Sequence, residues 1–169
     1  MPIQVDELRA AAAQSRFTKF ADSITDARRR GVRTAFLCHS HKDAHLAEGL
    51  IVLLSEHGWR LYVDWKDAEM PDRPNRETAE RIQARIIECN YFLFLATVNS
   101  TQSRWCPWEI GYADGKKTFD DMFVVPTRDS FATYGNEYLD LYRRIDFSDM
   151  RKLGAWRPNQ TQGVLVESL

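Results

Sequence analysis

Apolar runs along the chain predict its strands. The longest unbroken run, 91–96, contains only apolar residues, which is typical of a strand buried on both faces of a parallel sheet packed between helices. Shorter or alternating runs predict four further strands, at 34–38, 59–63, 122–126 and 144–147. The last of these alternates apolar and polar residues, so we expect it at an edge of the sheet.

Apolar residues spaced three and four positions apart predict the helices between these strands. We expect a long helix over 6–30, one over 46–57 and one that begins after Asn75, which can cap it. The triple arginine 28–30 suits the end of the first helix, and a phosphate-binding patch is the alternative interpretation. The tail from Ser148 has little periodicity, and we expect it to be only partly ordered.

The alternation of strands and helices predicts a three-layer α/β sandwich with right-handed crossovers. We expect a five-stranded parallel sheet in the flavodoxin-like order 2-1-3-4-5, with an extra N-terminal helix. The expected division is an N-terminal helical extension over 1–31, the main domain over 32–150 and a C-terminal tail over 151–169. In this order the carboxyl ends of the first and third strands lie together, and ligands of such folds bind beyond that edge.

Composition and charge argue against several classes of partner. The chain has 169 residues and a net charge of -1, so it is long enough for one domain with a core. Its charge balance gives no electrostatic reason to expect nucleic acid or an anionic membrane as partner. No segment approaches the ~20 apolar residues that cross a bilayer, and the N-terminus lacks a signal-peptide pattern, so we expect a cytoplasmic protein. The three cysteines are widely spaced, which predicts reduced thiols and no metal site.

Three motifs lie at or just beyond the ends of predicted strands: F-L-C-H-S-H-K-D at 36–43, L-Y-V-D at 61–64 and S-R-W-C-P-W-E-I at 103–110. In this order and spacing they resemble the first-strand box, the second strand with its BB loop, and the S-x-W-C-x-x-E-L box of Toll/interleukin-1 receptor (TIR) domains. The match covers about residues 34–147. His39 departs from the tyrosine that is common in the family, and the proline-containing loop departs from that of animal adaptors. With no second domain expected, the chain resembles free-standing bacterial TIR proteins, some of which are similar to the sensor enzymes of anti-phage systems such as Thoeris.

The resemblance implies an enzyme, an NAD+ glycohydrolase or ADP-ribosyl cyclase, that uses NAD+ as substrate and needs no cofactor. Catalytic TIR domains cleave the nicotinamide–ribose bond to give ADP-ribose or a cyclic isomer, and the resemblance places their catalytic glutamate at Glu109. One carboxylate suits this chemistry, because nicotinamide leaves from a cationic pyridinium without a general acid while the ribose becomes an oxocarbenium-like cation. We expect the substrate-binding residues to gather beside Glu109: Cys38, His39, Ser40, Trp65 and Trp105.

Each of these assignments has a structural alternative. Glu109 can be a surface helix residue, and His39 can be a polar strand-end residue without a ligand. Trp105 fits core packing as well as an aromatic wall for nicotinamide, and we expect Trp108 in the core. Cys106 is not expected to act as a nucleophile, because the motif implies no partner histidine.

The same residues and fold also fit functions other than NAD+ cleavage. A TIR domain can be a non-catalytic interaction module, as a scaffold or a mimic of host signalling, and a nucleoside deoxyribosyltransferase shares the fold type and a catalytic glutamate. A receiver domain lacks support because no acids cluster after the first strand, and a Rossmann redox enzyme would need G-x-G-x-x-G there. The expected partners are NAD+, further copies bound through the loop 65–75, and an effector that senses the nucleotide product in bacterial immune signalling.

Overall fold

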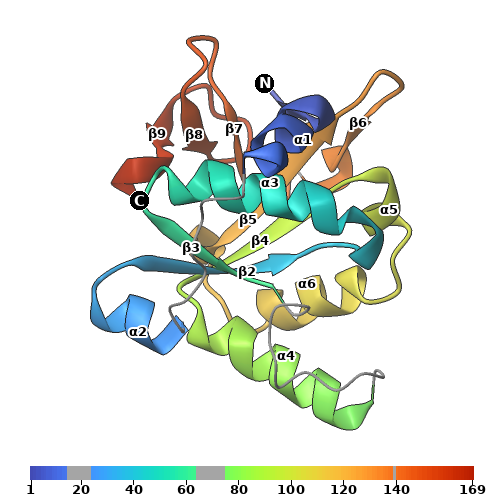
Figure 1. Ribbon diagram of the computed structural model, residues 1–169, viewed down its shortest axis with the longest axis vertical. Coiled ribbons are helices and arrows are strands. Elements are labelled where there is room, and N and C mark those ends of the chain that lie inside the picture. Colours follow the sequence, from blue (N-terminus) through green and yellow to red (C-terminus); the bar gives the residue numbers. More distant parts are fainter. Residues whose placement is uncertain (15–23, 64–74, 139) are drawn as a thin grey trace.

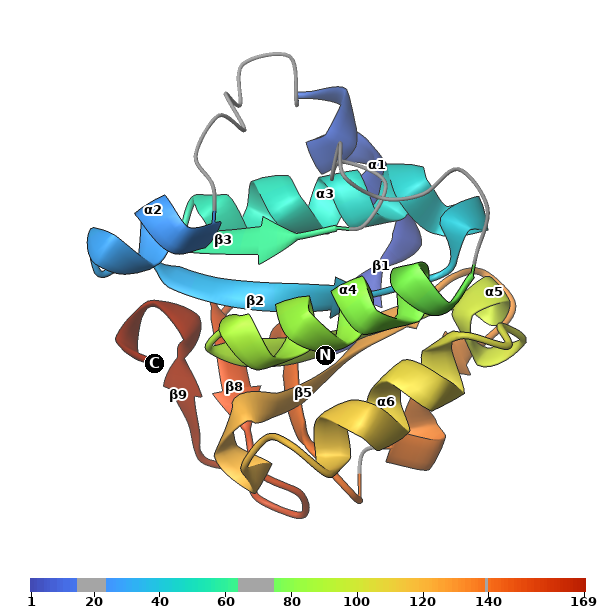
Figure 2. The ribbon, with the colours of Figure 1, turned by 90° about the horizontal axis from the view of Figure 1, so that it is seen from below.

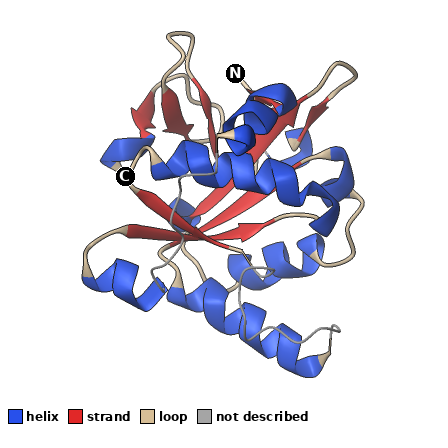
Figure 3. Ribbon diagram, in the orientation of Figure 1, coloured by secondary structure: helices blue, strands red, loops and turns tan. Residues whose placement is uncertain are grey.

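The computed structural model describes residues 1–14, 24–63, 75–138 and 140–169. A twisted, mostly parallel sheet forms the middle of the molecule, with helices on both of its faces (Figures 1 and 3). α1 and α3 cover one face, whereas α4 and α6 cover the other. This layering confirms the predicted α/β class. The helices are α1 (Val5–Ala13), α2 (Ile24–Arg29), α3 (Ala44–Ser55), α4 (Arg76–Glu88), α5 (Val98–Thr101) and α6 (Cys106–Asp114).

Five parallel strands make the centre of the sheet, in the spatial order β3-β2-β4-β5-β7. Numbered along the chain, these five strands lie in the order 2-1-3-4-5. β4 is the segment of the longest apolar run, and it pairs with β2 on one side and β5 on the other, so the prediction of an interior position is confirmed. The five strands are β2 (Arg33–Cys38), β3 (Trp59–Tyr62), β4 (Tyr91–Ala96), β5 (Met122–Arg128) and β7 (Arg143–Phe147).

The sheet has nine strands in the described part of the chain, not five. β8 (Leu153–Trp156) and β9 (Gly163–Leu165) extend it in antiparallel fashion beyond β7. The short strands β1 (Ile3–Gln4) and β6 (Thr133–Tyr134) pair with β5. The predictions of five strands, of an edge position for 144–147 and of a partly ordered tail are therefore wrong.

The polar residues of β7 are covered by distant parts of the chain, which explains the wrong edge prediction. Asp146 is buried, with one carboxylate oxygen 3.3 Å from the Met1 amino group and 3.3 Å from Arg144 Nε. The Arg144 guanidinium lies 5.2 Å from the centre of the Trp156 ring in β8. The apolar–polar alternation of β7 thus reflects ion pairing and cation–π contact rather than a wet face.

Residues 5–29 contain two described helices instead of one long helix. α1 ends at Ala13 with Gln14 as its C-cap, and residues 15–23 lie outside the described part. α2 ends two residues before Gly31, whose positive φ of 69° is typical of a helix C-terminus.

The predicted N-terminal extension and C-terminal tail both pack with the central part of the chain. α1 packs on α3, and β1 and β8 lie in the same sheet as β4. The domain boundaries at 31 and 150 stay predictions.

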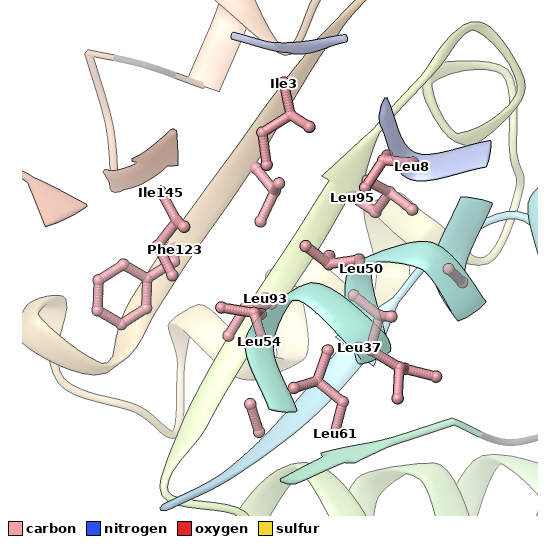
Figure 4. Close-up of a cluster of buried hydrophobic side chains, with 14 of the residues drawn as sticks. Ile3, Leu8, Leu37, Leu50, Leu54, Leu61, Leu93, Leu95, Phe123 and Ile145 are labelled. Atoms are coloured by element: carbon pink, nitrogen blue, oxygen red, sulfur yellow. The ribbon is translucent and has the colours of Figure 1, made fainter. Parts of the chain in front are cut away.

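β4 contributes side chains to both apolar layers of the molecule. Leu93 and Leu95 join the layer beneath α1 and α3, where Leu50 is also fully buried (Figure 4). Phe92 and Phe94 join the layer beneath α4 and α6. Burying a side chain of this size stabilises the fold by about 1.5–3 kcal/mol relative to exposure. The strand that leads to the candidate site is therefore held firmly from both sides.

α4 begins as predicted at Asn75. Asn75 Oδ1 accepts a hydrogen bond from Thr78 N at 2.9 Å, and Thr78 Oγ1 accepts one from Asn75 N at 3.1 Å, which forms a capping box.

None of the described helices combines the length and apolar character needed to cross a membrane. The short 3-10 helices are η2 (His41–Asp43), η4 (Phe119–Asp121), η5 (Asn136–Tyr138) and η6 (Val166–Ser168).

Candidate active site

A buried aspartate joins the two loops that follow β2 and β4. Asp43, in the turn η2 after β2, accepts a hydrogen bond from Thr97 Oγ1 at 2.5 Å and from Asn99 Nδ2 at 2.7 Å. Thr97 also caps α5 through Ser100 N, at 3.0 Å. The carboxyl ends of the two neighbouring strands are thereby fixed to each other. Asp43 belongs to the first motif of the sequence, but its role as a link between loops was not predicted.

Asp43→Asn is expected to destabilise the protein by about 1–3 kcal/mol, because the amide lacks the negative charge that strengthens both buried hydrogen bonds and offers one acceptor oxygen where the carboxylate offers two. Urea denaturation followed by circular dichroism measures the free energy of unfolding. Asp149→Asn is a suitable control, since Asp149 is exposed in the turn after β7. An Asp43→Asn protein as stable as the Asp149→Asn protein would show that this link does not hold the loops.

Glu109 lies in the first turns of α6. Pro107 occupies the start of this helix, where proline is tolerated, and the backbone N–H of Glu109 donates to the Trp105 carbonyl at 2.9 Å. The Glu109 residue is only 7% exposed. The alternative in which Glu109 is a surface helix residue is therefore wrong, and its carboxylate lies on the side of α6 that faces the sheet.

Two thiols lie beside Glu109 in the interior. Cys38, the last residue of β2, has Sγ 3.9 Å from the Cys106 carbonyl oxygen. Burial, a hydrogen bond with Cys106 and the charge of Glu109 together raise the pKa of the Cys38 thiol well above its usual range, so it stays protonated at neutral pH. A hydrogen bond from Cys38 is the main cause that lowers the pKa of Cys106. Both cysteines are buried, which leaves neither thiol accessible as a nucleophile.

His39 and Ser40, two of the predicted substrate-binding residues, follow β2, and their side chains contact nearby backbone groups. His39 Nδ1 lies 3.0 Å from the Leu37 carbonyl oxygen, and Ser40 Oγ accepts a hydrogen bond from Lys42 N at 3.4 Å. Both residues are buried and lie at the same sheet edge as Cys38. Trp65, together with the loop 65–74, lies outside the described residues.

The two tryptophans of the third motif form a corner on α6. Their ring centres are 5.5 Å apart, with an angle of 87° between the planes. Trp108 is 36% exposed, so the prediction that it lies in the core is wrong. Trp105 packs partly against the core and partly lines a groove that α6 forms with α4. The cationic residues of that groove, Arg76 and Arg104, were not predicted, because nothing in their spacing along the chain shows that they share a surface.

Cys38, Cys106 and Glu109 thus come together at the carboxyl edge of β2 and β4, with Trp105 one helical turn before Glu109. In a low-dielectric setting, a carboxylate interacts more strongly with a nearby positive charge than it does in water. Such an arrangement can stabilise a cation that develops during a reaction at this edge.

Comparison with known proteins agrees with the motifs. The family model described as TIR domain matches residues 35–162. The chain is also similar to a protein of Bacillus cereus (strain MSX-D12) named "Probable 3' cyclic ADP-D-ribose synthase ThsB'", with 37% identity over 110 residues. The matched region covers 63% of this chain and 57% of that relative, so the chain spans little more than half of the relative's length.

Proposed function

Because the chain belongs to the TIR domain family, we propose that it cleaves the bond between nicotinamide and ribose in NAD+. The observation that carries this proposal is the position of Glu109, which the motif designates as the catalytic glutamate. It is 7% exposed and lies beside Cys38 at the carboxyl end of β2. β2 and β4 meet there at the switch point of the sheet, the place where doubly wound folds bind their ligands.

In the proposed reaction, the bond between ribose C1′ and the pyridinium nitrogen breaks. Its electron pair passes to nicotinamide, which leaves as a neutral molecule, and C1′ becomes an oxocarbenium-like cation. The carboxylate of Glu109 stabilises this cation. Water, or a hydroxyl of the same ADP-ribose unit, then bonds to C1′ and gives up its proton to Glu109. NAD+ is the substrate in this scheme, and no cofactor is required.

The other residues of the predicted site take supporting roles in this proposal. Trp105, one turn before Glu109, forms an aromatic wall for the nicotinamide ring. His39 and Ser40 border the ribose from the end of β2. Cys38 is fully buried, so its thiol supports Glu109 from the interior instead of contacting solvent. Trp65 remains in the proposed site on the strength of the sequence alone.

We propose a cyclic isomer of ADP-ribose as the main product, with linear ADP-ribose as the hydrolytic alternative. Support comes from the name of the Bacillus cereus relative, a 3′ cyclic ADP-D-ribose synthase. Such a nucleotide would act as a signal for an effector protein in bacterial anti-phage defence. Self-association through TIR surfaces, including the loop 65–75, would control the activity.

Purified protein incubated with NAD+ is expected to release nicotinamide and a nucleotide, and mass spectrometry identifies the nucleotide because the cyclic product lacks the water that hydrolysis adds. Specific activity that rises with protein concentration would support control by self-association. The Glu109→Gln protein, prepared in the same way, is the control for a contaminating enzyme. Absence of nicotinamide release at every concentration would contradict the proposal and favour a non-catalytic interaction module. Base exchange with deoxynucleosides would favour a deoxyribosyltransferase.

A further inference from the structure

A groove runs between two helices on one face of the molecule. α4 and α6 pack against each other and lie side by side, with their amino ends toward the edge of the sheet to which β2 points (Figure 2). The space between them has a volume of about 490 Å³, within the range of small-molecule sites. Its lining combines cationic, amide and aromatic side chains: Arg76, Ala79, Gln83, Arg104, Trp105 and Trp108.

The two arginines lie where the amino ends of the helices meet. Arg76 is the first residue of α4, and Arg104 directly precedes Trp105, the N-cap of α6. The positive ends of both helix dipoles add to their charge. Among the described residues Arg104 has no ion-pair partner, and Arg76 pairs through Nε with Glu80 at 2.7 Å. That pair is exposed, and exposed pairs contribute little, so Arg76 can turn to a stronger anion at small cost. This end of the groove suits a ligand with two adjacent negative groups.

The aromatic and amide side chains lie further along the same helices. Trp108, in the first turn of α6, comes four positions after Arg104, and Gln83 follows Arg76 by seven positions on α4. The Trp105–Trp108 corner offers one ring face and one ring edge. A flat heterocycle can stack on such a face, and a glutamine amide can bond the N6 and N7 edge of adenine. An exposed tryptophan in a groove is also typical of ligand contact.

The groove connects to the candidate catalytic residue through α6. The Trp105 carbonyl accepts the Glu109 N–H at 2.9 Å, so the wall of the groove and the carboxylate are one helical turn apart. On the basis of the proposed function, we infer that this groove binds the adenosine diphosphate half of NAD+. Arg76 and Arg104 pair with the diphosphate, Trp108 stacks on the adenine, and Gln83 bonds its edge. The nicotinamide end then passes Trp105 toward Glu109.

Titration with ADP tests this inference without any need for catalysis. ADP is expected to quench the tryptophan fluorescence of the wild type, because Trp108 would stack on the base. The double variant Arg76→Gln/Arg104→Gln is expected to bind ADP at least tenfold more weakly, since a factor of ten corresponds to the loss of about one charge-assisted contact and the variant removes two. Trp108→Leu is expected to weaken binding similarly.

Arg81→Gln is the matched control. Arg81 lies on the same helix as Arg76 and makes the same kind of pair, with Glu77 at 2.9 Å, but it does not line the groove. Its affinity for ADP should equal that of the wild type. Equal ADP affinity in the wild type and the double variant, or an equal loss in the Arg81→Gln protein, would overturn the inference.

Kinetics separate this inference from the proposed function. If the protein cleaves NAD+, the double variant should raise KM at least about tenfold while kcat changes less than threefold, because the lost contacts are made in both the ground state and the transition state. Nicotinamide release with an unchanged KM in the double variant would refute the groove inference and leave the proposed function intact. ADP binding that depends on the two arginines, in a protein that releases no nicotinamide, would keep the groove as a nucleotide site and refute the proposed function.

Discussion

Glu109→Gln is expected to slow nicotinamide release by a factor of about 10²–10³, the usual cost of losing one preorganised electrostatic contact to the transition state. Glutamine has nearly the size of glutamate and can still accept hydrogen bonds from the ribose hydroxyls. It lacks the negative charge that faces the oxocarbenium-like cation. Affinity for NAD+ should change much less, because the ground state keeps most of its contacts. Initial rates of nicotinamide release and the dissociation constant for NAD+ measure the two effects.

Stability measurements show whether Glu109 acts in catalysis or in folding. The free energy of unfolding of the Glu109→Gln protein should differ from that of the wild type by no more than about 1 kcal/mol, since the amide can keep the contact with Cys38. Glu56→Gln is the control for the chemical change, because Glu56 is exposed at the end of α3. Full turnover by Glu109→Gln would remove Glu109 from the mechanism. A collapsed melting temperature would identify it as a structural residue.

Gly49→Ala is expected to destabilise the protein by about 3 kcal/mol, the upper end for overpacking a core. A Cβ atom at Gly49 would lie 1.9 Å from the Leu8 carbonyl oxygen, and backbone atoms cannot rotate out of the way as a side chain does. α1 would have to move away from α3, which would loosen the packing around Leu8 and Leu50. The midpoint of urea denaturation should fall accordingly.

Gly111→Ala provides the same substitution in an open helical position. In the described part of the chain, no atom beyond the two neighbouring residues and the backbone of α6 itself lies within 4 Å of a Cβ built at Gly111. Alanine is favoured over glycine inside a helix by about 1 kcal/mol. The Gly111→Ala protein should therefore be slightly more stable than the wild type. A Gly49→Ala protein with wild-type stability would show that α1 does not pack on α3 in solution as described.

The sequence by itself determined the centre of the fold. The unbroken apolar run of β4 predicts a strand buried on both faces, and the structure places its alternate residues in two opposite layers. The cap at Asn75 is equally local, because the side chain bonds a backbone group three residues away. The three motifs also identified the family, since they combine residue types with spacings along the chain. Each of these features depends on neighbours within a few positions or on order along the sequence.

Only the tertiary structure decided which polar residues are buried and which aromatic residues are exposed. Asp146 and Arg144 gave their segment the alternating pattern of an edge strand. In the structure the amino group of Met1 pairs with Asp146, and Trp156 of β8 packs against Arg144, so segments from the two ends of the chain cover these residues. Trp108 was predicted to lie in the core, but the packing of α4 against α6 leaves it exposed in the groove between them. The same packing places Arg76 and Arg104 in one groove. Burial and charge depend on what packs over a residue, and the segments that do so are distant in sequence. Periodicity reports only which side of its own helix or strand a residue occupies.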